Sequence, residues 1–300
     1  MSVRRLGFIG LGNIGGAVCA NLLADGHQVA VLDIETARVT AMEKVGGRPA
    51  ATVLDVAEEA DVTFMSLPTP AVMEAVAAEW LPAGKGKILV DLTTNAPATV
   101  RAVGARLTAG GASLVEAPLT GGAPGAQARA LVFIVGGDPE PVAELRPILD
   151  TIGRATFHLG PLGCGNVGKL LNSLLAFSAT WASIEALALA ARHDIDLRTV
   201  LEMVRTGGAS NFYIDRLVES IGAQDRPTTF ALELAAKDAG LMVELGRETT
   251  VPLPLASAVL QVLVLAGAQG LGERDYADLP RLMEKLADLE FRLRPPDSAD

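Results

Sequence analysis

The chain has 300 residues, a formal net charge of −10 and an apolar fraction of 50%. This length allows one large domain or two ordinary ones, and the apolar fraction supplies a sizeable core. The acidic balance argues against a nucleic-acid surface, which needs a basic stripe. Two cysteines are too few for a disulfide scaffold.

The first predicted unit is a strand, a glycine-rich turn and a helix. The apolar run Leu6–Ile9 predicts a buried strand, and the periodic stretch Ile14–Leu23 predicts a helix. The glycines between them have the spacing G-x-G-x-x-G: Gly10, Gly12 and Gly15. A second β-rich run, Gln28–Leu32, ends at Asp33.

Each part of this unit has a role in binding a dinucleotide. Gly10 permits the tight turn, Gly12 lets the backbone approach a pyrophosphate, and Gly15 lets the helix pack close to the strand. The helix N-terminus offers N–H groups and a positive dipole end to the phosphates. The expected cofactor contacts in the turn are Gly10, Leu11, Gly12, Asn13, Ile14 and Gly15. The alternative is a glycine-rich turn in another kind of α/β protein.

Asp33 predicts that the cofactor is NAD rather than NADP. Its carboxylate, at about the usual 20 residues from the turn, accepts the ribose 2′-hydroxyl and repels a 2′-phosphate. Glu35 adds a second negative charge. Arg38 is the one cation nearby in the sequence, and we expect it to lie a helix turn away.

Strands and helices alternate from Leu6 to about His158, which predicts a mostly parallel, doubly wound sheet. The further expected strands are Asp61–Ser66, Lys87–Asp91, Ala112–Glu116, Leu131–Val135 and Ala155–Leu159. Helix-like stretches lie between them, such as Pro70–Trp80 and Ala98–Ala109.

The pattern changes at Gly160–Gly165, which is rich in glycine and proline. Residues Gly165 to His193 predict one long helix, and no strand-like run follows. The further expected helices are Leu197–Arg205, Phe230–Glu248, Pro254–Ala268 and Leu279–Arg292. We therefore expect a Rossmann-type dinucleotide-binding domain over residues 1–162 and an all-α domain for substrate and oligomerisation over residues 163–300.

Two of the expected helices are apolar over much of their surface. Gly165–His193 and Ser257–Ala268 both indicate burial against another subunit, with burial inside one domain as the alternative. Ala256–Ala268, the longest later apolar stretch, is too short to span a bilayer. Glycines interrupt the apolar N-terminal run that would otherwise mimic a signal peptide. We expect a soluble, cytoplasmic protein with no membrane contact.

Polar and glycine residues follow several expected strands, where an open α/β sheet builds its site. The expected contributors to the cofactor site are Leu67, Pro68 and Thr94. After the strand that ends at Glu116, Thr120 precedes Gly121 and Gly122. A hydroxyl followed by two unobstructed N–H groups is a candidate carboxylate or phosphate cradle. The alternative is a plain turn whose glycines supply positive φ angles.

Lys169 stands out because only six of the 25 basic residues are lysines. It lies in the apolar first turn of the long helix, where desolvation and the positive dipole end both lower the pKa of a lysine. A lowered pKa suits a general acid/base near neutral pH. Asn172 and Ser173, at i+3 and i+4, share its face. Lys237 is a second candidate cation; alternatively, it is a solvated lysine paired with Glu233.

Five stretches together resemble the 3-hydroxyisobutyrate dehydrogenase family, the β-hydroxyacid dehydrogenases, over nearly the whole chain. They are GFIGLGNIGGAVCANL, VDLTTNAP, EAPLTGGAPGA with LVFIVGG, GCGNVGKLLNSLL and FALELAAKD. The resemblance implies a Rossmann domain, a helical C-terminal domain and a homodimer or homotetramer built on the long helix. It also implies metal-free, reversible oxidation of a small anionic β-hydroxy acid, such as 3-hydroxyisobutyrate, or reduction of a tartronate semialdehyde-like compound.

The resemblance also implies roles for single residues. Lys169 matches the catalytic lysine, Thr94 a residue near the nicotinamide, and Lys237 a lysine beside the cofactor. The implied substrate-carboxylate loop is Thr120, Gly121 and Gly122. Asn172 keeps the identity that the family has there and positions Lys169 and the substrate hydroxyl, with Ser173 as a further substrate contact.

The sequence departs from the family at two site positions. Thr120 replaces the usual serine, which narrows the pocket, and Ser173 replaces an asparagine or glutamine, which enlarges it. In NADP-using members an arginine follows the strand end, where this chain has Ile34. Two rival functions are an imine reductase, in which another residue usually replaces the lysine, and a non-catalytic dinucleotide-binding module.

Overall fold

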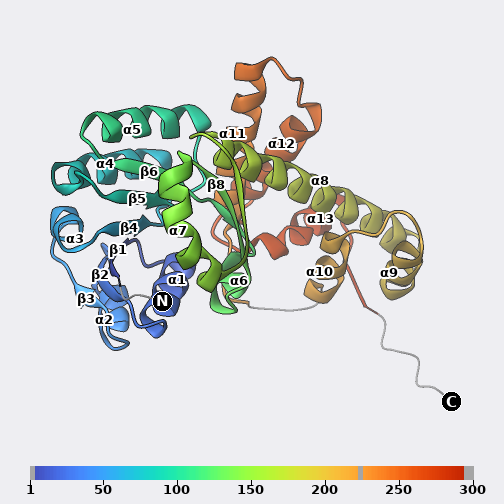
Figure 1. Ribbon diagram of the computed structural model, residues 1–300. Helices are drawn as coiled ribbons and strands as arrows, with labels where there is room; N and C mark the ends of the chain where they lie inside the picture. Colours follow the sequence, from blue (N-terminus) through green and yellow to red (C-terminus); the bar gives the residue numbers. More distant parts are fainter. Residues whose placement is uncertain (1–3, 222–225, 294–300) are drawn as a thin grey trace. The chain divides into compact units, whose positions relative to one another are not determined.

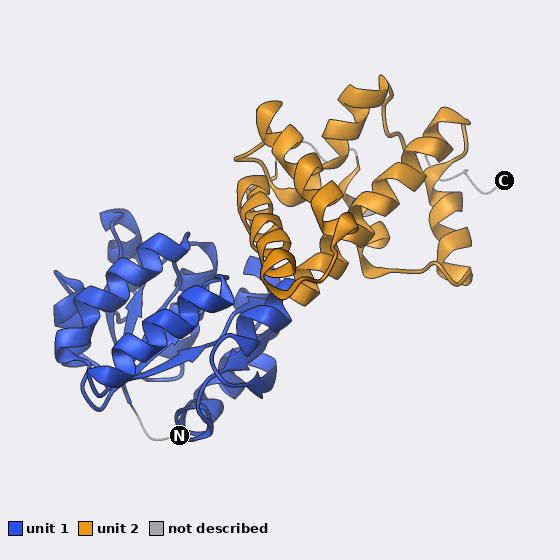
Figure 2. Cartoon of the chain, turned by 90° about the horizontal axis from the view of Figure 1, so that it is seen from above, with its two compact units in different colours: residues 1–170 blue, residues 171–300 orange. Residues whose placement is uncertain are grey.

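The computed structural model describes residues 4–221 and 226–293. The chain forms two compact units, residues 1–170 and residues 171–300 (Figure 2). The first unit holds the sheet with its helices, and the second is helical.

A nine-stranded sheet fills the first unit in the order β3-β2-β1-β4-β5-β6-β8-β7, with β9 paired to β8. The strands are β1 (Arg5–Ile9), β2 (Gln28–Leu32), β3 (Arg48–Pro49), β4 (Val62–Met65), β5 (Ile88–Asp91), β6 (Ser113–Glu116), β7 (Leu119–Thr120), β8 (Leu131–Gly136) and β9 (Gly153–Gly160). The pairs from β3 to β6 are parallel, and β8 runs antiparallel to both β6 and β7. The order 3-2-1-4-5-6 is that of a Rossmann sheet.

Helices cover both faces of this sheet (Figure 1). They are α1 (Asn13–Ala24), α2 (Thr36–Glu43), α3 (Val53–Glu59), α4 (Pro70–Trp80), α5 (Pro97–Ala109), α6 (Gly122–Gln127) and α7 (Pro139–Ile152). One apolar cluster packs α1, α6 and α7 against one face, and a second packs α3, α4 and α5 against the other. The strands are continuous apolar runs because both of their sides are buried.

Trp80, at the end of α4, is the largest fully buried side chain. Its indole Nε1 donates a hydrogen bond of 2.9 Å to Thr63 Oγ1 on β4. A buried indole normally needs such a partner. The bond therefore fixes α4 against the centre of the sheet as well as filling the core.

The second unit contains most of α8 and the helices that follow it. Their bounds are α8 (Cys164–Arg192), α9 (Leu197–Thr206), α10 (Phe212–Ser220), α11 (Leu232–Thr249), α12 (Pro254–Ala268) and α13 (Pro280–Ala287). Three aromatic rings pack together in its interior: Phe177 of α8 lies 6.4 Å from Phe230 and 5.2 Å from Tyr276, measured between centroids.

The Rossmann-type sheet followed by a helical unit confirms the predicted fold class, and the differences lie at single elements. The two-residue strands β3 and β7 and the short helix α10 were not expected. Asn211 starts α10 by accepting the N–H groups of Tyr213 and Ile214. The last helix, expected to reach Arg292, ends early because Asp288 adopts a left-handed φ of 47°.

The length and apolarity of α8 correct the expectation that Ala256–Ala268 is the longest apolar stretch in the later part of the chain. Among the described residues, α8 is the helix long and apolar enough to cross a membrane by length and composition, with a mean hydropathy of 1.6. Its first turn, however, is hydrogen-bonded to the buried carboxylate of Glu116 on β6. The start of α8 is therefore attached to the sheet of the first unit.

Candidate active site

The glycine turn after β1 leaves no room for two side chains and leaves space at a third. A Cβ atom at Gly10 would lie 2.3 Å from Ser66 O, and one at Gly15 would lie 2.1 Å from Gly10 O. Gly10 also has a φ of +89°. At Gly12, Arg38 Nη1, 3.8 Å away, is the one described atom within 4 Å. The turn is therefore packed against other main chain at Gly10 and Gly15 and has open space beside Gly12.

The N-terminus of α1 is available to an anion. Within the described part of the chain, no side chain caps this helix, and its first turn holds no acidic residue. The positive end of the helix dipole then favours negative charge beside Gly12 and Asn13. These residues fit the pyrophosphate of a dinucleotide.

Asp33 ties the end of β2 to the glycine turn. Its Oδ2 accepts the N–H of Leu11 at 2.6 Å, and its Oδ1 accepts the N–H of Glu35 at 2.8 Å. Arg38 Nη1 lies 3.6 Å from Asp33 Oδ2, and Arg38 Nη2 lies 2.8 Å from Glu35. The expectation that Arg38 lies a helix turn away was therefore wrong for its side chain, which folds back from α2 onto the strand end.

The loops after β4 and β5 are bonded to each other at the same edge of the sheet. The N–H of Leu67, beside Pro68, donates to Thr93 Oγ1 at 3.1 Å, and the N–H of Thr93 donates to Asp91 Oδ1 at 3.0 Å. Thr94 follows and is half-buried. Thr93 was not among the expected site residues, yet its hydroxyl holds the backbone of Leu67, which was.

Thr120 ends β7, and Gly121 is the N-cap of α6. Thr120 pairs with Val132 in the antiparallel ladder and is half-buried. Gly121 and Gly122 have φ angles of +117° and +62°, which residues other than glycine rarely adopt. These backbone angles are by themselves sufficient to explain why both positions hold glycine.

Glu116, the last residue of β6, binds the first turn of α8. The side chain is completely buried. Its Oε1 accepts the N–H groups of Gly163 and Gly165, and its Oε2 accepts the N–H and the Nδ2 of Asn166. Burial raises the pKa of the Glu116 carboxyl, and the hydrogen bonds oppose that rise.

A second buried carboxyl continues this network. Asp91 Oδ2 accepts from Asn95 Nδ2 at 2.7 Å, and the N–H of Asn95 donates to Asn166 Oδ1 at 2.7 Å. Burial raises the pKa of Asp91 to about 7. The ends of β5 and β6 are therefore joined to each other through the start of α8.

Lys169 follows Asn166 by one helical turn and is half-buried in the first unit. Three other expected site residues lie in the second unit. Asn172 is half-buried and Ser173 is buried on α8, and Lys237 of α11 forms an ion pair of 2.9 Å with the buried Asp238.

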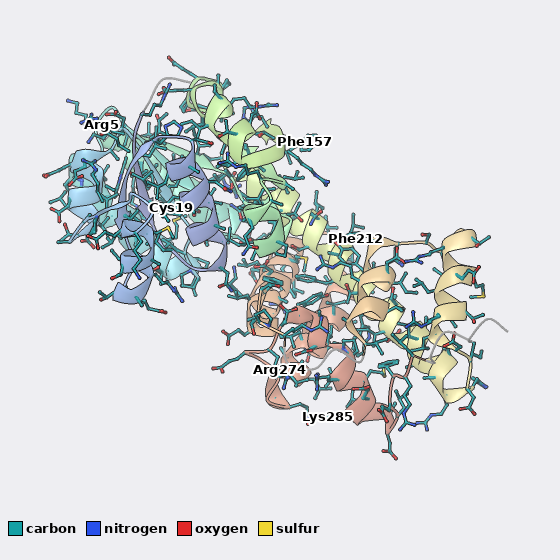
Figure 3. The ribbon with its side chains drawn as sticks, turned by 90° about the horizontal axis from the view of Figure 1, so that it is seen from below. Arg5, Cys19, Phe157, Phe212, Arg274 and Lys285 are labelled. Atoms are coloured by element: carbon teal, nitrogen blue, oxygen red, sulfur yellow. The ribbon has the colours of Figure 1, made fainter. Side chains whose placement is uncertain are left out.

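The cysteines are not part of a reactive or metal-binding cluster in the described residues. No group of three or more His, Cys, Asp or Glu side chains that could hold a metal occurs within residues 4–221 and 226–293. Cys19 lies inside the first unit (Figure 3), and burial raises the pKa of its thiol to about 12. A thiol with that pKa is unreactive at neutral pH.

A doubly wound sheet with an open glycine turn after its first strand is the architecture of a dinucleotide-binding protein. Residues 5–160 match the model of the NAD binding domain of 6-phosphogluconate dehydrogenase. Residues 163–283 match the model described as NAD-binding of NADP-dependent 3-hydroxyisobutyrate dehydrogenase.

Relatives match over nearly their whole lengths. A 3-hydroxyisobutyrate dehydrogenase of Pseudomonas aeruginosa is 32% identical over 93% of this chain and 97% of its own. A 2-(hydroxymethyl)glutarate dehydrogenase of Eubacterium barkeri is 30% identical over 94% and 95%. A NAD-dependent L-serine dehydrogenase of P. aeruginosa is 29% identical over 94% and 98%. The chain belongs to the 3-hydroxyisobutyrate dehydrogenase family.

Solved structures share the fold. The Mycobacterium tuberculosis 3-hydroxyisobutyrate dehydrogenase with L-serine superposes with a TM-score of 0.86 at 24% identity, covering 94% of this chain and 99% of that one. An imine reductase of Myxococcus stipitatus with NAD+ gives a TM-score of 0.65 at 23% identity, covering 94% and 100%. The relatives named as dehydrogenases make this chain a NAD-dependent oxidoreductase that acts on hydroxyl groups.

Proposed function

We propose that the protein catalyses reversible hydride transfer between NAD and a small β-hydroxy acid, with Lys169 as the general acid/base. One observation carries the assignment. Glu116, the last residue of β6, binds the first turn of α8 and so sets Lys169 at the carboxyl edge of the sheet. The open glycine turn follows β1 at that same edge.

Each residue of the proposed site has a distinct role in the reaction. When bound, NAD would supply the hydride acceptor for oxidation and the hydride donor for reduction. Lys169 takes the hydroxyl proton during oxidation and returns it during reduction. Asn172 positions Lys169 and the hydroxyl, and Ser173 contacts the substrate. The carboxylate is held by the Thr120 hydroxyl and by the backbone N–H groups of Gly121 and Gly122.

The proposed cofactor contacts come from the glycine turn, from the strand ends of the sheet and from α11. Its proposed residues are Gly10, Leu11, Gly12, Asn13, Ile14, Gly15, Asp33, Leu67, Pro68, Thr94 and Lys237. The contacts at Asp33 and Leu67 support the first-unit members, because these residues are already fixed at the sheet edge by hydrogen bonds. The proposed domain limits are residues 1–162 and 163–300.

The names of the relatives suggest the substrate class. L-Serine, 3-hydroxyisobutyrate and 2-(hydroxymethyl)glutarate each carry a primary hydroxyl one carbon beyond the carbon that bears a carboxylate. We propose a substrate with this same relation of hydroxyl to carboxylate. The methyl of Thr120 favours a short substituent on the α-carbon.

We also propose that the protein is a homodimer or homotetramer in the cytoplasm. On α8, Leu171, Leu175 and Leu189 are 56%, 72% and 67% exposed. Their spacing, with Ala182 exposed between them, places them along one stripe of the helix. A contiguous apolar stripe of this kind is typical of a subunit interface.

The test is a panel of β-hydroxy acids and the matching semialdehydes, followed by NADH absorbance, with the wild type, Lys169→Ala and Lys285→Ala. Lys285 lies on α13 and serves as the control. We expect Lys169→Ala to bind NADH normally and to lose about 10²- to 10⁴-fold in kcat, the usual range for general acid/base catalysis. A variant that keeps most of its kcat would exclude Lys169 as the acid/base, and imine reduction or a non-catalytic role would then be favoured.

A further inference from the structure

The first turn of α8 is held by side chains that do not themselves take part in the proposed chemistry. We propose that Glu116 and Asn166 are positioning residues, which fix the height and rotation of this turn and thereby place the Lys169 amine. The inference rests on the proposed role of Lys169. It adds two residues, on different elements, whose function is to hold that lysine.

The contacts are unusual for a helix N-terminus. A helix leaves its first N–H groups without partners, and a residue next to them in sequence normally accepts one of them. Here Glu116, 47 residues before Gly163 and 50 before Asn166, accepts three backbone N–H groups and one side-chain amide. One carboxylate from the sheet thus does the work of a complete N-terminal cap.

The carboxylate cannot shift within its surroundings. A Cβ atom at Gly136 would lie 2.2 Å from Glu116 Oε1, and one at Gly165 would lie 3.0 Å from Glu116 Cδ and 2.8 Å from Gly136 N. The main chains of β8 and α8 therefore enclose the carboxyl group from two sides. The turn can move only if this enclosure opens.

Asn166 extends the attachment to a second strand. Its Oδ1 accepts the N–H of Asn95, while its Nδ2 donates to Glu116. Asn95 in turn donates to Asp91, the last residue of β5. The start of α8 is consequently hydrogen-bonded to the ends of both β5 and β6. The loop after β5 also carries the proposed cofactor contact Thr94.

We call Glu116 and Asn166 the clamp. Lys169 lies three residues after Asn166 and four after Gly165, so it projects from the turn that the clamp holds. Displacing a catalytic group by about 1 Å can cost about 10²-fold in rate. Burying a carboxylate is also expensive, and well-packed apolar residues often stabilise a fold equally well. A positional role explains why a buried charge occupies this site.

The experiment compares Glu116→Gln, Asn166→Asp and the double variant Glu116→Gln/Asn166→Asp with the wild type. Glu116→Gln keeps the shape but turns an acceptor into an amide that faces N–H groups. Asn166→Asp alone sets two carboxylates against each other. The double variant restores one donor and one acceptor across the pair, and the carboxylate at 166 still accepts from Asn95. Glu144→Gln is the matched control, since Glu144 pairs with Arg4 at the surface.

Three readouts are needed: hydrogen exchange of residues 163–166 in the NAD-free protein, the Kd for NADH, and kcat with KM for the hydroxy acid. In both single variants we expect faster exchange in this segment, a kcat about 10- to 100-fold lower, and a Kd for NADH within about twofold of the wild type. The double variant should recover at least part of the protection and of kcat. If a single variant does not fold, Asn166→Ala takes its place with the same expectations, because it removes both side-chain bonds of Asn166, to Asn95 and to Glu116, and keeps the backbone N–H groups that Glu116 accepts.

Unchanged kcat with faster exchange would show that the clamp is structural only and would overturn the inference. So would a double variant no better than the worse single variant, because the two residues would then not act as a pair. Lys169→Ala is measured in parallel. If it alone keeps its kcat, the proposed function fails, whereas a loss in Lys169→Ala without a loss in the clamp variants refutes only the clamp.

Discussion

The Asp33 carboxylate is almost fully engaged by the protein itself. It accepts the N–H groups of Leu11 and Glu35, and Arg38 lies beside it. The Asp33 carboxylate therefore shapes the glycine turn and would also favour a ribose with a free 2′-hydroxyl over one with a 2′-phosphate. Ile34, directly after the strand, is completely exposed and offers a 2′-phosphate no cation.

We expect the wild type to prefer NAD over NADP by about tenfold or more in kcat/KM, the size expected for a hydrogen bond to a charged group. In Asp33→Ala this preference should narrow, because Arg38 then keeps only Glu35 as a partner and is available to a 2′-phosphate. Steady-state kinetics with both cofactors measure the change. Comparable kcat/KM values for the two cofactors in the wild type would contradict the prediction.

Thr120 should govern the size of the substrate's α-substituent. Thr120→Ser should retain activity on the native substrate and admit bulkier groups, since one methyl in such a pocket is worth about 1–3 kcal/mol of discrimination. Thr120→Val keeps the shape and removes the hydroxyl, so kcat/KM should fall by about tenfold or more. Equal activity in Thr120→Val would mean that the N–H groups of Gly121 and Gly122 hold the carboxylate alone.

Asp91 should make stability depend on pH. Its pKa rises from an ordinary 3.8 to about 7 on burial, so between these values the folded state keeps a proton that the unfolded carboxyl has released. Its contribution is complete below pH about 4 and is lost as the pH rises to about 7.

Asp91→Asn should remove this dependence. Relative to the wild type, its free energy of unfolding should improve by a few kcal/mol between pH 4 and 7. Asn95 can adapt to the new amide, because its Oδ1 is a buried acceptor without a partner in the described residues. Urea unfolding at several pH values tests the claim, and parallel pH profiles for the two proteins would refute it.

At the scale of elements, the glycine turn shows how tightly β1, α1 and the loop after β4 pack. A Cβ atom at Gly15 would meet the carbonyl oxygen of Gly10 at 2.1 Å and Phe8 at 3.1 Å. The first of these is backbone and cannot move aside. The close approach of α1 to β1 thus depends on this one missing side chain.

Gly15→Ala should therefore destabilise the first unit by about 1–3 kcal/mol, as overpacking does, and weaken NADH binding by moving the start of α1. Gly267→Ala is the control: it lies in α12, nothing in the described chain lies within 4 Å of its added Cβ, and alanine should stabilise the helix by about 0.5–1 kcal/mol. Denaturant unfolding and NADH titration separate the two effects. A Gly15→Ala protein as stable as the wild type would disprove the packing argument.

The elements that sequence patterns predicted are those with a strong local signal. β1, β4 and β5 are short apolar runs, and α8 and α12 lie within one residue of, or match, the predicted bounds. The two-residue strand β7 exists only because β8 extends beyond the carboxyl end of β6 and offers it a partner. No local pattern reports such pairing.

The candidate site also contains residues with a local sequence signal and residues whose contacts form only in the folded chain. The glycine turn, Asp33 and Lys169 carry their chemistry in local spacing, so the sequence alone is enough to predict them as site residues. Glu116 looked like an ordinary strand-end residue, because its partners begin 47 residues later and the contact depends on the folded sheet. Arg38 was misplaced for a related reason, since the direction of its long side chain is set by charges and not by its helical position.

For the whole molecule, the exposed stripe of α8 predicts assembly. Leu175→Glu puts a charge at the most exposed of the three leucines and should convert the oligomer into a monomer that keeps its helical content. Light scattering coupled to gel filtration gives the mass, and Glu144→Gln at the surface of the first unit is the control. A Leu175→Glu protein with the wild-type mass would place the interface elsewhere.

The chain also contains its own spectroscopic reporters. It has two tryptophans, and one lies in each unit: Trp80, hydrogen-bonded to Thr63 beneath α4, and the half-buried Trp181 of α8. Since Trp80 is withdrawn from solvent, its emission should be blue-shifted while the sheet unit is intact. Trp181→Phe would leave Trp80 to report on the dinucleotide-binding unit, and Trp80→Phe would leave Trp181 to report on the helical one. Fluorescence of the two single-tryptophan proteins would then show whether the units melt together or in succession.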